Sequence, residues 1–299
     1  MRHFLYLKSN KSGIGDRLLD LMLVYTYSQY LNCEKLYLHW TEDNVDMTGN
    51  KSIYSTIRRE KTPFRSVDYL LKNLLDYIIL PDNIFFVNPK ELDIMSKDSE
   101  NTIFNEYMGM KYTLYSFMKK MNIHDKIKFE TEYYNNFKKI QFKNIPENII
   151  NNFTNNNILT VHLRRGDKVV NDNGEALGIP YNQLDDLDNK TILAINKLYN
   201  LNYTKVCFVS DEKEIRNKYI NLFKDKVECI YFDGNEISQT YFDLYCLSSS
   251  KIILLSQKFS VFSIFSSMIN KSKLLYLLDF KKTNEFAEYE NINKFNFNY

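Results

Sequence analysis

The chain has 299 residues, of which 44% are hydrophobic and 25% charged, and its formal net charge is +2. These values are ordinary for a soluble globular protein. They argue against a general nucleic-acid binder, which would carry a strongly basic face or domain. The length favours two domains over one.

The first half of the chain begins with a strand–helix–strand pattern. A strand is expected over residues 3–7, a glycine turn over 12–15, a helix over 16–30 and a second strand over 35–39. This βαβ unit predicts a parallel sheet. From about residue 50 to 130 the pattern is less regular, and we expect short helices over 67–77 and 105–120 and a strand over 83–87.

The second half repeats the alternation more regularly. Residues 145–157 have a polar, turn-forming composition, which favours a domain boundary there and divides the chain into domains 1–150 and 151–299. Beyond it, alternating strands and helices predict a second doubly wound sheet. The expected strands cover 158–163, 205–209, 228–231, 251–255 and 274–277, and the expected helices cover 188–199, 212–223, 238–248 and 260–269.

The cysteines and histidines are few and scattered. Cys33, Cys207, Cys229 and Cys246 form no Cys-x-x-Cys pair, so we expect buried free thiols and a reducing compartment. Four isolated histidines argue against a histidine-based metal site. The start of the chain is too short for a signal peptide and no apolar stretch is long enough to span a bilayer, so we expect a cytoplasmic protein.

Residues 158–169, Ile-Leu-Thr-Val-His-Leu-Arg-Arg-Gly-Asp-Lys-Val, are the most informative segment. The apolar run predicts a buried strand, and Arg164 and Arg165 follow its carboxyl end, where open α/β sheets bind their ligands. Guanidinium groups bind phosphate oxygens bidentately, so the segment predicts a site for an anionic ligand. The alternative is that both arginines are turn charges paired with Asp167.

This segment resembles a known signature. Val-His-Leu-Arg-Arg-Gly-Asp-Lys-Val at 161–169 is similar to the motif of the α1,2-, α1,6- and protein-O-fucosyltransferase superfamily, which uses GDP-fucose. The His-x-Arg-Arg-Gly-Asp form is typical of α1,2 enzymes, and Asp-Lys-Val is typical of core α1,6 enzymes. Further segments resemble the family in the same order, at 13–18, 208–211, 242–248 and 259–263. Residues 45–140 match nothing in it.

The resemblance implies roles for the donor site. Arg164 would contact the β-phosphate of GDP, where negative charge grows as the fucosyl bond breaks. Arg165 would pack or pair structurally beside it, for example with Asp167. His162 would bond the guanine O6 edge, and Asp243 would accept the protons of guanine N1 and N2. The alternative for His162 is that it is a core histidine, and the alternative for Asp243 is that it is an ordinary helix residue.

Other donor-site residues follow from the same resemblance. Ser260 and Ser263, at the start of a helix, would bond phosphate with the helix N-terminal N–H groups, or they are simple caps. Asp211 corresponds to the aspartate of the family's strand that ends in Ser/Thr-Asp, and it would belong to the donor site. The turn of Gly13 and Gly15 is expected to approach the cleft, at the border of the donor or acceptor site.

A base for the acceptor hydroxyl is expected in the loop after the motif. The position of the core α1,6 glutamate falls on Asp172, with Glu175 nearby, and Lys168 would tune that carboxylate or bind phosphate. The alternative is an ordinary turn at 171–174. On the other side of the cleft, Arg17 would follow the glycine turn.

Three further readings stay open. Asp186-Leu187-Asp188 has the Asp-x-Asp pattern of metal-dependent glycosyltransferases, but a helix N-terminus with acidic residues also explains it. Arg165-Gly166-Asp167 is a tripeptide that adhesion receptors bind. A transferase for another GDP-sugar is the nearest alternative among enzymes.

The resemblance thus implies a GT-B-like α/β protein with two Rossmann-type domains facing across a cleft. Residues 1–150 would be the acceptor-side domain and 151–299 the GDP-sugar-binding domain. We expect an inverting, metal-independent enzyme that moves L-fucose from GDP-fucose to a hydroxyl of a glycan or oligosaccharide, with no cofactor and no nucleic acid. Gly166 favours α1,2 linkage; Lys168 and Val169 keep α1,6 open.

Overall fold

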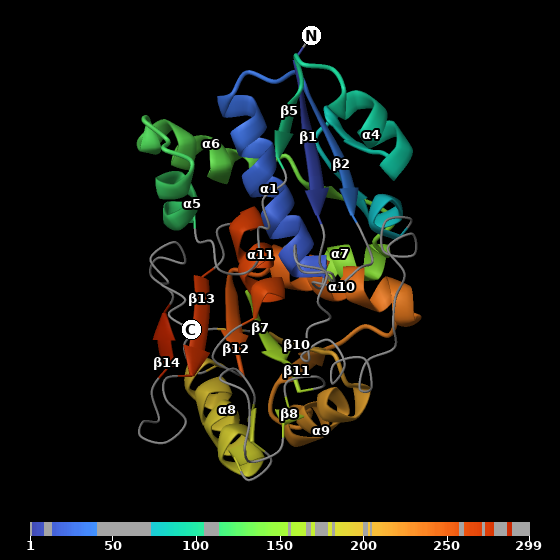
Figure 1. Ribbon diagram of the computed structural model, residues 1–299. Helices are drawn as coiled ribbons and strands as arrows, with labels where there is room; N and C mark the ends of the chain where they lie inside the picture. Colours follow the sequence, from blue (N-terminus) through green and yellow to red (C-terminus); the bar gives the residue numbers. More distant parts are fainter. Residues whose placement is uncertain are drawn as a thin grey trace. The chain divides into compact units, whose positions relative to one another are not determined.

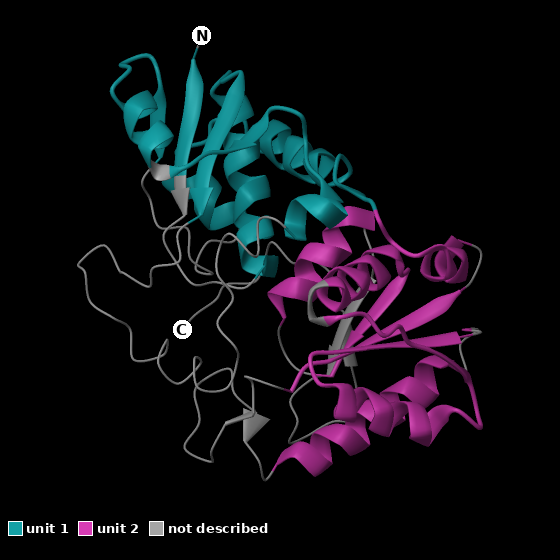
Figure 2. Cartoon of the chain, turned by 90° about the vertical axis from the view of Figure 1, so that its right-hand side faces the viewer, with its two compact units in different colours: residues 1–143, 293–298 teal, residues 144–292, 299 magenta. Residues whose placement is uncertain are grey.

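The computed structural model describes residues 2–8, 14–40, 73–104, 114–154, 157–165, 169–170, 179–180, 183–199, 203, 205–256, 260–270, 273–277 and 286–288. They form a mixed α/β structure with parallel sheets (Figure 1). The chain divides into two compact units (Figure 2). Unit 1 comprises Met1–Lys143 with Asn293–Asn298, and unit 2 comprises Asn144–Ile292 with Tyr299.

Unit 1 contains a four-stranded parallel sheet in the order β4-β2-β1-β5. Its strands are β1 (His3–Lys8), β2 (Lys35–Trp40), β4 (Ile84–Phe86) and β5 (Thr102–Phe104), with a separate antiparallel pair of β3 (Ile78–Ile79) and β6 (Gln141–Phe142). Its helices include α1 (Ile14–Tyr30), α4 (Pro89–Ser96), α5 (Leu114–Lys120) and α6 (Lys126–Phe137), and residues 73–77 are also helical.

The helix α1 is the centre of unit 1. Leu18, Leu21 and Met22 are fully buried, so the helix is covered over much of its circumference, as its apolar flank predicts. It packs on α6, where the buried Asn136 donates to Thr26 Oγ1 at 2.9 Å. Burial of an amide is tolerated here because it is hydrogen-bonded.

Unit 2 contains a six-stranded sheet in the order β11-β10-β7-β12-β13-β14. Its strands are β7 (Ile158–Leu163), β10 (Lys205–Ser210), β11 (Glu228–Ile230), β12 (Ile252–Leu255), β13 (Lys273–Leu277) and β14 (Phe286–Glu288), and a short parallel pair joins β8 (Val169–Val170) to β9 (Ile179–Pro180). The helices are α7 (Glu147–Thr154), α8 (Leu184–Tyr199), α9 (Lys213–Phe223), α10 (Glu236–Ser249) and α11 (Val261–Asn270).

The strand order of unit 2 is that of a Rossmann fold. Counted along the chain from β7, the strands lie in the order 3-2-1-4-5-6. All pairs are parallel except that of β13 with β14, which is antiparallel and which the sequence did not predict. Helices α8 and α9 lie on one face of the sheet, and α10 and α11 on the other (Figure 1).

The two faces of β7 serve different layers. Leu159, Val161 and Leu163 pack into a core cluster with residues of α8 and α9. Thr160 and His162 point to the opposite face, where they contact Ser250 and Ser263. All six residues of β7 are buried, as the apolar run predicts for a central parallel strand.

Two helix boundaries correct the sequence prediction. Residues 145–157 were expected as a polar boundary segment, but α7 occupies Glu147–Thr154 because Ile149 and Phe153, four residues apart, are both buried. Helix α8 begins at Leu184 and not at residue 188. Residues 67–72 and 105–113 of two other predicted helices lie outside the described part of the chain.

Two sequence features are visible directly. All four cysteines are free thiols; Cys229 is half-buried and the others are buried. Within the described ranges, no helix combines the length and apolarity needed to cross a membrane.

Candidate functional site

The carboxyl end of β7 lies at the switch point of the unit 2 sheet. On one side of the sheet the chain proceeds outward from β7 to β10 and β11. On the other side it proceeds outward from β12 to β13 and β14. The next helix after β7, α8, and the next helix after β12, α11, lie on opposite faces of the sheet (Figure 1). Crevices at such switch points are where doubly wound sheets bind ligands. The Ser256 N–H after β12 donates to the His162 carbonyl of β7 at 3.1 Å, which fixes the two strand ends together.

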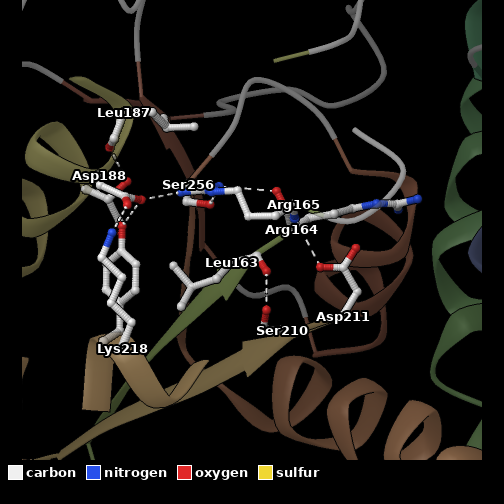
Figure 3. A network of polar contacts seen from close by, with 11 residues as sticks. Leu163, Arg164, Arg165, Leu187, Asp188, Ser210, Asp211, Lys218 and Ser256 are labelled. Atoms are coloured by element: carbon white, nitrogen blue, oxygen red, sulfur yellow. Dashed lines mark hydrogen bonds and ion pairs between the residues drawn. The ribbon is translucent and has the colours of Figure 1, made fainter. Parts of the chain in front are cut away.

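Arg165 is buried in a network of polar contacts at this edge (Figure 3). Its Nη2 lies 2.8 Å from Asp188 Oδ1 on α8, and its Nη1 donates to Ser256 Oγ at 2.9 Å and to the Arg164 carbonyl at 3.2 Å. The expectation that Arg165 pairs structurally holds, but its partner is Asp188. Asp167 lies outside the described residues.

Asp188 is the centre of that network. Lys218 Nζ lies 2.6 Å from its Oδ2, and the Tyr219 hydroxyl donates to its Oδ1 at 2.6 Å. Burial acts to raise the pKa of Asp188, but the hydrogen bonds from Lys218, Tyr219 and Arg165 outweigh it and lower that pKa. The carboxylate is therefore ionised at neutral pH. Burial raises the pKa of Tyr219, and its hydrogen bond to Asp188 and the charge of Asp188 raise it further, against the charge of Arg165.

Arg164 and Arg165 extend in opposite directions (Figure 3). Arg165 runs toward α8, and Arg164 runs away from Asp188. The alternation of a β-strand accounts for this, because Arg165 continues the side of Leu163, whereas Arg164 continues the side of His162. Arg164 is half-buried, whereas Arg165 is 3% exposed.

Asp211, at the end of β10, fixes the backbone between the two arginines. Its Oδ1 accepts the Arg165 N–H at 3.0 Å. The preceding Ser210 donates from Oγ to the Leu163 carbonyl at 2.7 Å. The Ser-Asp pair of the predicted motif thus holds the end of β7 in place.

His162 lies on the α11 side of β7 and is 4% exposed. Its Nδ1 is 2.5 Å from Ser263 Oγ on α11. Burial first, and then the charges of Arg164 and Arg165, lower the pKa of His162 to about 3. The ring is therefore neutral over the physiological range.

Asp243 lies on α10 and is held by the turn that opens this helix. Gln239 Nε2 donates to Asp243 Oδ1 at 2.7 Å, and Gln239 Oε1 accepts the Gly234 N–H at 2.8 Å. Burial of the carboxyl raises the pKa of Asp243 to about 8, with the Gln239 hydrogen bond and the Arg216 charge opposing the shift and Asp211 adding to it.

Ser260 immediately precedes α11 and its carbonyl accepts the Ile264 N–H at 3.0 Å. Its Oγ is buried and has no hydrogen-bond partner among the residues that the structure describes. A buried hydroxyl without a partner costs free energy unless a ligand or water supplies one. Ser263, one turn later, is the partner of His162 and not a helix cap.

Several predicted site residues lie outside the described part of the chain, namely Gly13, Gly166, Asp167, Lys168, Asp172 and Glu175. Gly15 corrects the prediction of a glycine turn over 12–15, because α1 begins at Ile14 and contains it, whereas Arg17 lies in that helix as expected. Arg17 is buried, with its guanidinium 5.3 Å from the Trp40 ring centre at the carboxyl end of β2. Arg17 is thus a buried residue in the first turn of α1.

The two carboxylates of the Asp-x-Asp pattern have separate partners. Asp188 binds Arg165, Lys218 and Tyr219, and Asp186 forms an ion pair with Lys190 at 2.8 Å. In the described ranges, no group of three or more histidine, cysteine, aspartate or glutamate side chains could hold a metal ion. The pattern's observed contacts are structural.

Sequence reasoning missed four members of the site. Ser256 directly follows a predicted strand, so its place at the sheet edge was accessible from the pattern. Gln239 is four residues before Asp243, which on a helix predicts contact. Lys218 and Tyr219 carried no local signal, because only the packing of α9 brings them to Asp188.

A groove of about 740 Å³ lies elsewhere, in unit 1. Lys35 and Asn83 line it at the amino ends of β2 and β4. Parallel α/β sheets bind their ligands at the opposite, carboxyl edge. The groove is therefore not assigned to the candidate site.

The fold is similar to that of solved fucosyltransferases. The crystal structure of NodZ α1,6-fucosyltransferase soaked with GDP-fucose is 12% identical, with a TM-score of 0.52 over 96% of this chain and 98% of that chain. The same enzyme co-crystallized with GDP is 12% identical, with a TM-score of 0.52 over 96% of this chain and 97% of that chain. Fucosyltransferase NodZ from Bradyrhizobium is 12% identical, with a TM-score of 0.50 over 96% of this chain and 98% of that chain. No protein-family model matches this chain, and no curated protein matches it in sequence.

Proposed function

We propose that this protein is a fucosyltransferase that transfers L-fucose from GDP-fucose to a hydroxyl of a glycan. The observation that carries the proposal is the pair of diverging arginines at the switch point of a Rossmann-type sheet. The likeness in fold to an enzyme soaked with GDP-fucose supports it over nearly the whole chain.

In this proposal Arg164 binds the β-phosphate of GDP. Breaking the bond between fucose and the diphosphate leaves negative charge on that phosphate, so a fixed guanidinium stabilises the transition state more than the ground state. Arg165 is fully engaged by Asp188 and Ser256, so it holds the loop rather than the ligand. Ser260 supplies its hydroxyl to the phosphates beside the start of α11.

His162 and Asp243 bind the guanine base. A neutral imidazole whose Nδ1 accepts the Ser263 hydroxyl carries its own proton on Nε2, which donates to guanine O6. Asp243, oriented by Gln239, accepts the protons of guanine N1 and N2. Burial raises the pKa of Asp243 to about 8, so the carboxyl is largely protonated at neutral pH without a ligand. The two guanine donors would lower that pKa and favour the ionised form, which accepts from both.

The transfer proceeds with inversion and without a metal ion or other cofactor. Asp172 is the proposed base for the acceptor hydroxyl, and Lys168 neutralises charge beside it. In our proposal, which follows the GT-B-like enzymes that the sequence resembles, unit 1 binds the acceptor and unit 2 the donor. The linkage is α1,2 in our proposal, on the form of residues 162–167.

An α1,6 linkage is the second candidate. The Lys168-Val169 continuation favours it, and NodZ, to which the fold is similar, is an α1,6 enzyme. Linkage analysis of the fucosylated product decides between the two. The adhesion-receptor alternative has an observation against it, because the side chain of Arg165 in that tripeptide is buried in an ion pair.

Nucleotide binding and GDP release test the proposal. In a thermal-shift panel, GDP should raise Tm and UDP should not. With candidate glycan acceptors supplied, GDP release from GDP-fucose should exceed release from GDP-mannose and should persist in EDTA, where loss of activity would refute the metal-independent mechanism. Arg164→Ala should lower the release rate about 10²–10³-fold, whereas Arg2→Ala, at an exposed arginine of unit 1, should not.

A further inference from the structure

We infer that Asp188 is a positioning residue for Arg164: by binding Arg165 on one side of the β7 terminus, it directs Arg164 to the other. The inference rests on the proposed function, since it assigns Asp188 a role in the same reaction. Asp188 itself touches no part of the donor in this account.

The geometry makes Asp188 the main anchor of Arg165. The guanidinium of Arg165 binds Asp188 through Nη2 and Ser256 through Nη1, so both ends of its planar fork are fixed. Asp188 is in turn fixed by Lys218 and Tyr219 from α9. One carboxylate thus joins α8, α9 and the end of β7.

The backbone transmits this anchoring to Arg164. The Arg164 carbonyl accepts from Arg165 Nη1, and the Arg165 N–H donates to Asp211. The peptide group between the two arginines is therefore held from both sides. With that peptide fixed, strand alternation sends the Arg164 side chain away from α8.

Charge gives a second reason for the anchor. Two adjacent guanidinium groups at one strand end compete for the same anion, and an unanchored Arg165 would be free to bind phosphate in a second geometry. The ionised Asp188 forms an ion pair with Arg165 inside the protein and so neutralises its charge. A single arginine is then presented in one orientation, which is what preorganised transition-state stabilisation requires.

Asp188→Asn tests the inference against a matched control on the same helix. Asp186→Asn removes a carboxylate that is paired with Lys190 and whose side chain is 53% exposed. We expect Asp188→Asn to lower kcat for GDP release from GDP-fucose by about 10²-fold, the cost of a misplacement of about 1 Å. The Kd of GDP should change by less than the kcat, and Asp186→Asn should match the parent.

A double-mutant cycle separates positioning from general stability. If Asp188 acts through Arg164, Asp188→Asn in an Arg164→Ala background lowers kcat no further. An additional loss of the same size there would overturn the inference. Should Asp188→Asn fail to fold, Arg165→Lys replaces it in the same cycle, because lysine keeps the charge but cannot bind Asp188 and Ser256 together.

The outcomes distinguish the two proposals. A parent that neither binds GDP nor releases it from GDP-fucose overturns the proposed function and this inference with it. A parent that does both, with Asp188→Asn equal to Asp186→Asn, overturns the inference alone.

Discussion

The guanidinium of Arg165 lies 2.8 Å from the carboxylate of Asp188, and their side chains are only 3% and 12% exposed. This ion pair connects the end of β7 to the second turn of α8. The neighbouring Arg164 extends the other way (Figure 3). The two arginines of one motif therefore have different surroundings: Arg165 is bound within the protein, whereas Arg164 is the residue that we propose binds the donor phosphate.

Breaking the pair from one side should destabilise the protein strongly. Arg165→Met leaves the Asp188 carboxylate with only Lys218 and Tyr219 as partners and should lower the free energy of unfolding by about 1–3 kcal/mol. The double variant Arg165→Met/Asp188→Leu removes both charges and should recover most of that loss. Denaturation in urea measures both values, and equal destabilisation in the two variants would argue against a buried, mutually dependent pair.

Stability should depend on His162 at acid pH. Its pKa in the folded protein is about 3, whereas the unfolded chain binds a proton near pH 6.5. Since the unfolded state binds more protons between these values, stability should decline as the pH falls from 6.5 toward 3. His162→Gln should flatten that decline, and His124→Gln, at an exposed position, should not. Melting curves at successive pH values test this.

The ionisation of Asp243 should make stability depend on pH in the opposite direction. Its pKa is near 8 in the folded protein and near 3.8 in the unfolded chain, so the folded state holds the extra proton between these values. Stability contributed by this group should therefore fall as pH rises from 4 to 8. Asp243→Asn should raise Tm at pH 8 relative to the parent while abolishing GDP binding. An unchanged GDP affinity would remove Asp243 from the proposed guanine site; Asp225→Asn, at an exposed turn, is the control.

Gly234 should not tolerate a side chain. A Cβ there would lie 2.5 Å from Ser238 Oγ and 2.7 Å from the Gln239 backbone N. Gly234→Ala should cost about 1–3 kcal/mol and weaken GDP binding through the Gln239–Asp243 contact. Adding Ser238→Ala should not restore stability, because the clash with a backbone atom persists. Full rescue in the double variant would show that only the serine side chain is responsible.

The sequence predicted unit 2 well because its elements have strong local patterns. Apolar runs such as Ile158–Leu163 and Ile252–Leu255 match the observed strands closely. The three-residue β14 is too short for any pattern to indicate. Helix α7 was hidden by asparagines, although Ile149 and Phe153 already had helical spacing.

The site was predictable only in part, for a physical reason. Arg164 and Arg165 follow a strand whose alternation sets their opposite directions, so their divergence was accessible from the sequence. The partner of Arg165 was not, because Asp188 is 23 residues away and reaches it only through the packing of α8. The predicted partner, Asp167, was chosen for its nearness in the chain.

GDP release from GDP-fucose in the presence of candidate glycan acceptors, by the parent and by Arg164→Ala, tests the central claim most directly. The account predicts steady release by the parent, and a rate about 10²–10³-fold lower in Arg164→Ala with Tm unchanged. A parent that binds UDP in preference to GDP, or an Arg164→Ala variant as active as the parent, would contradict it.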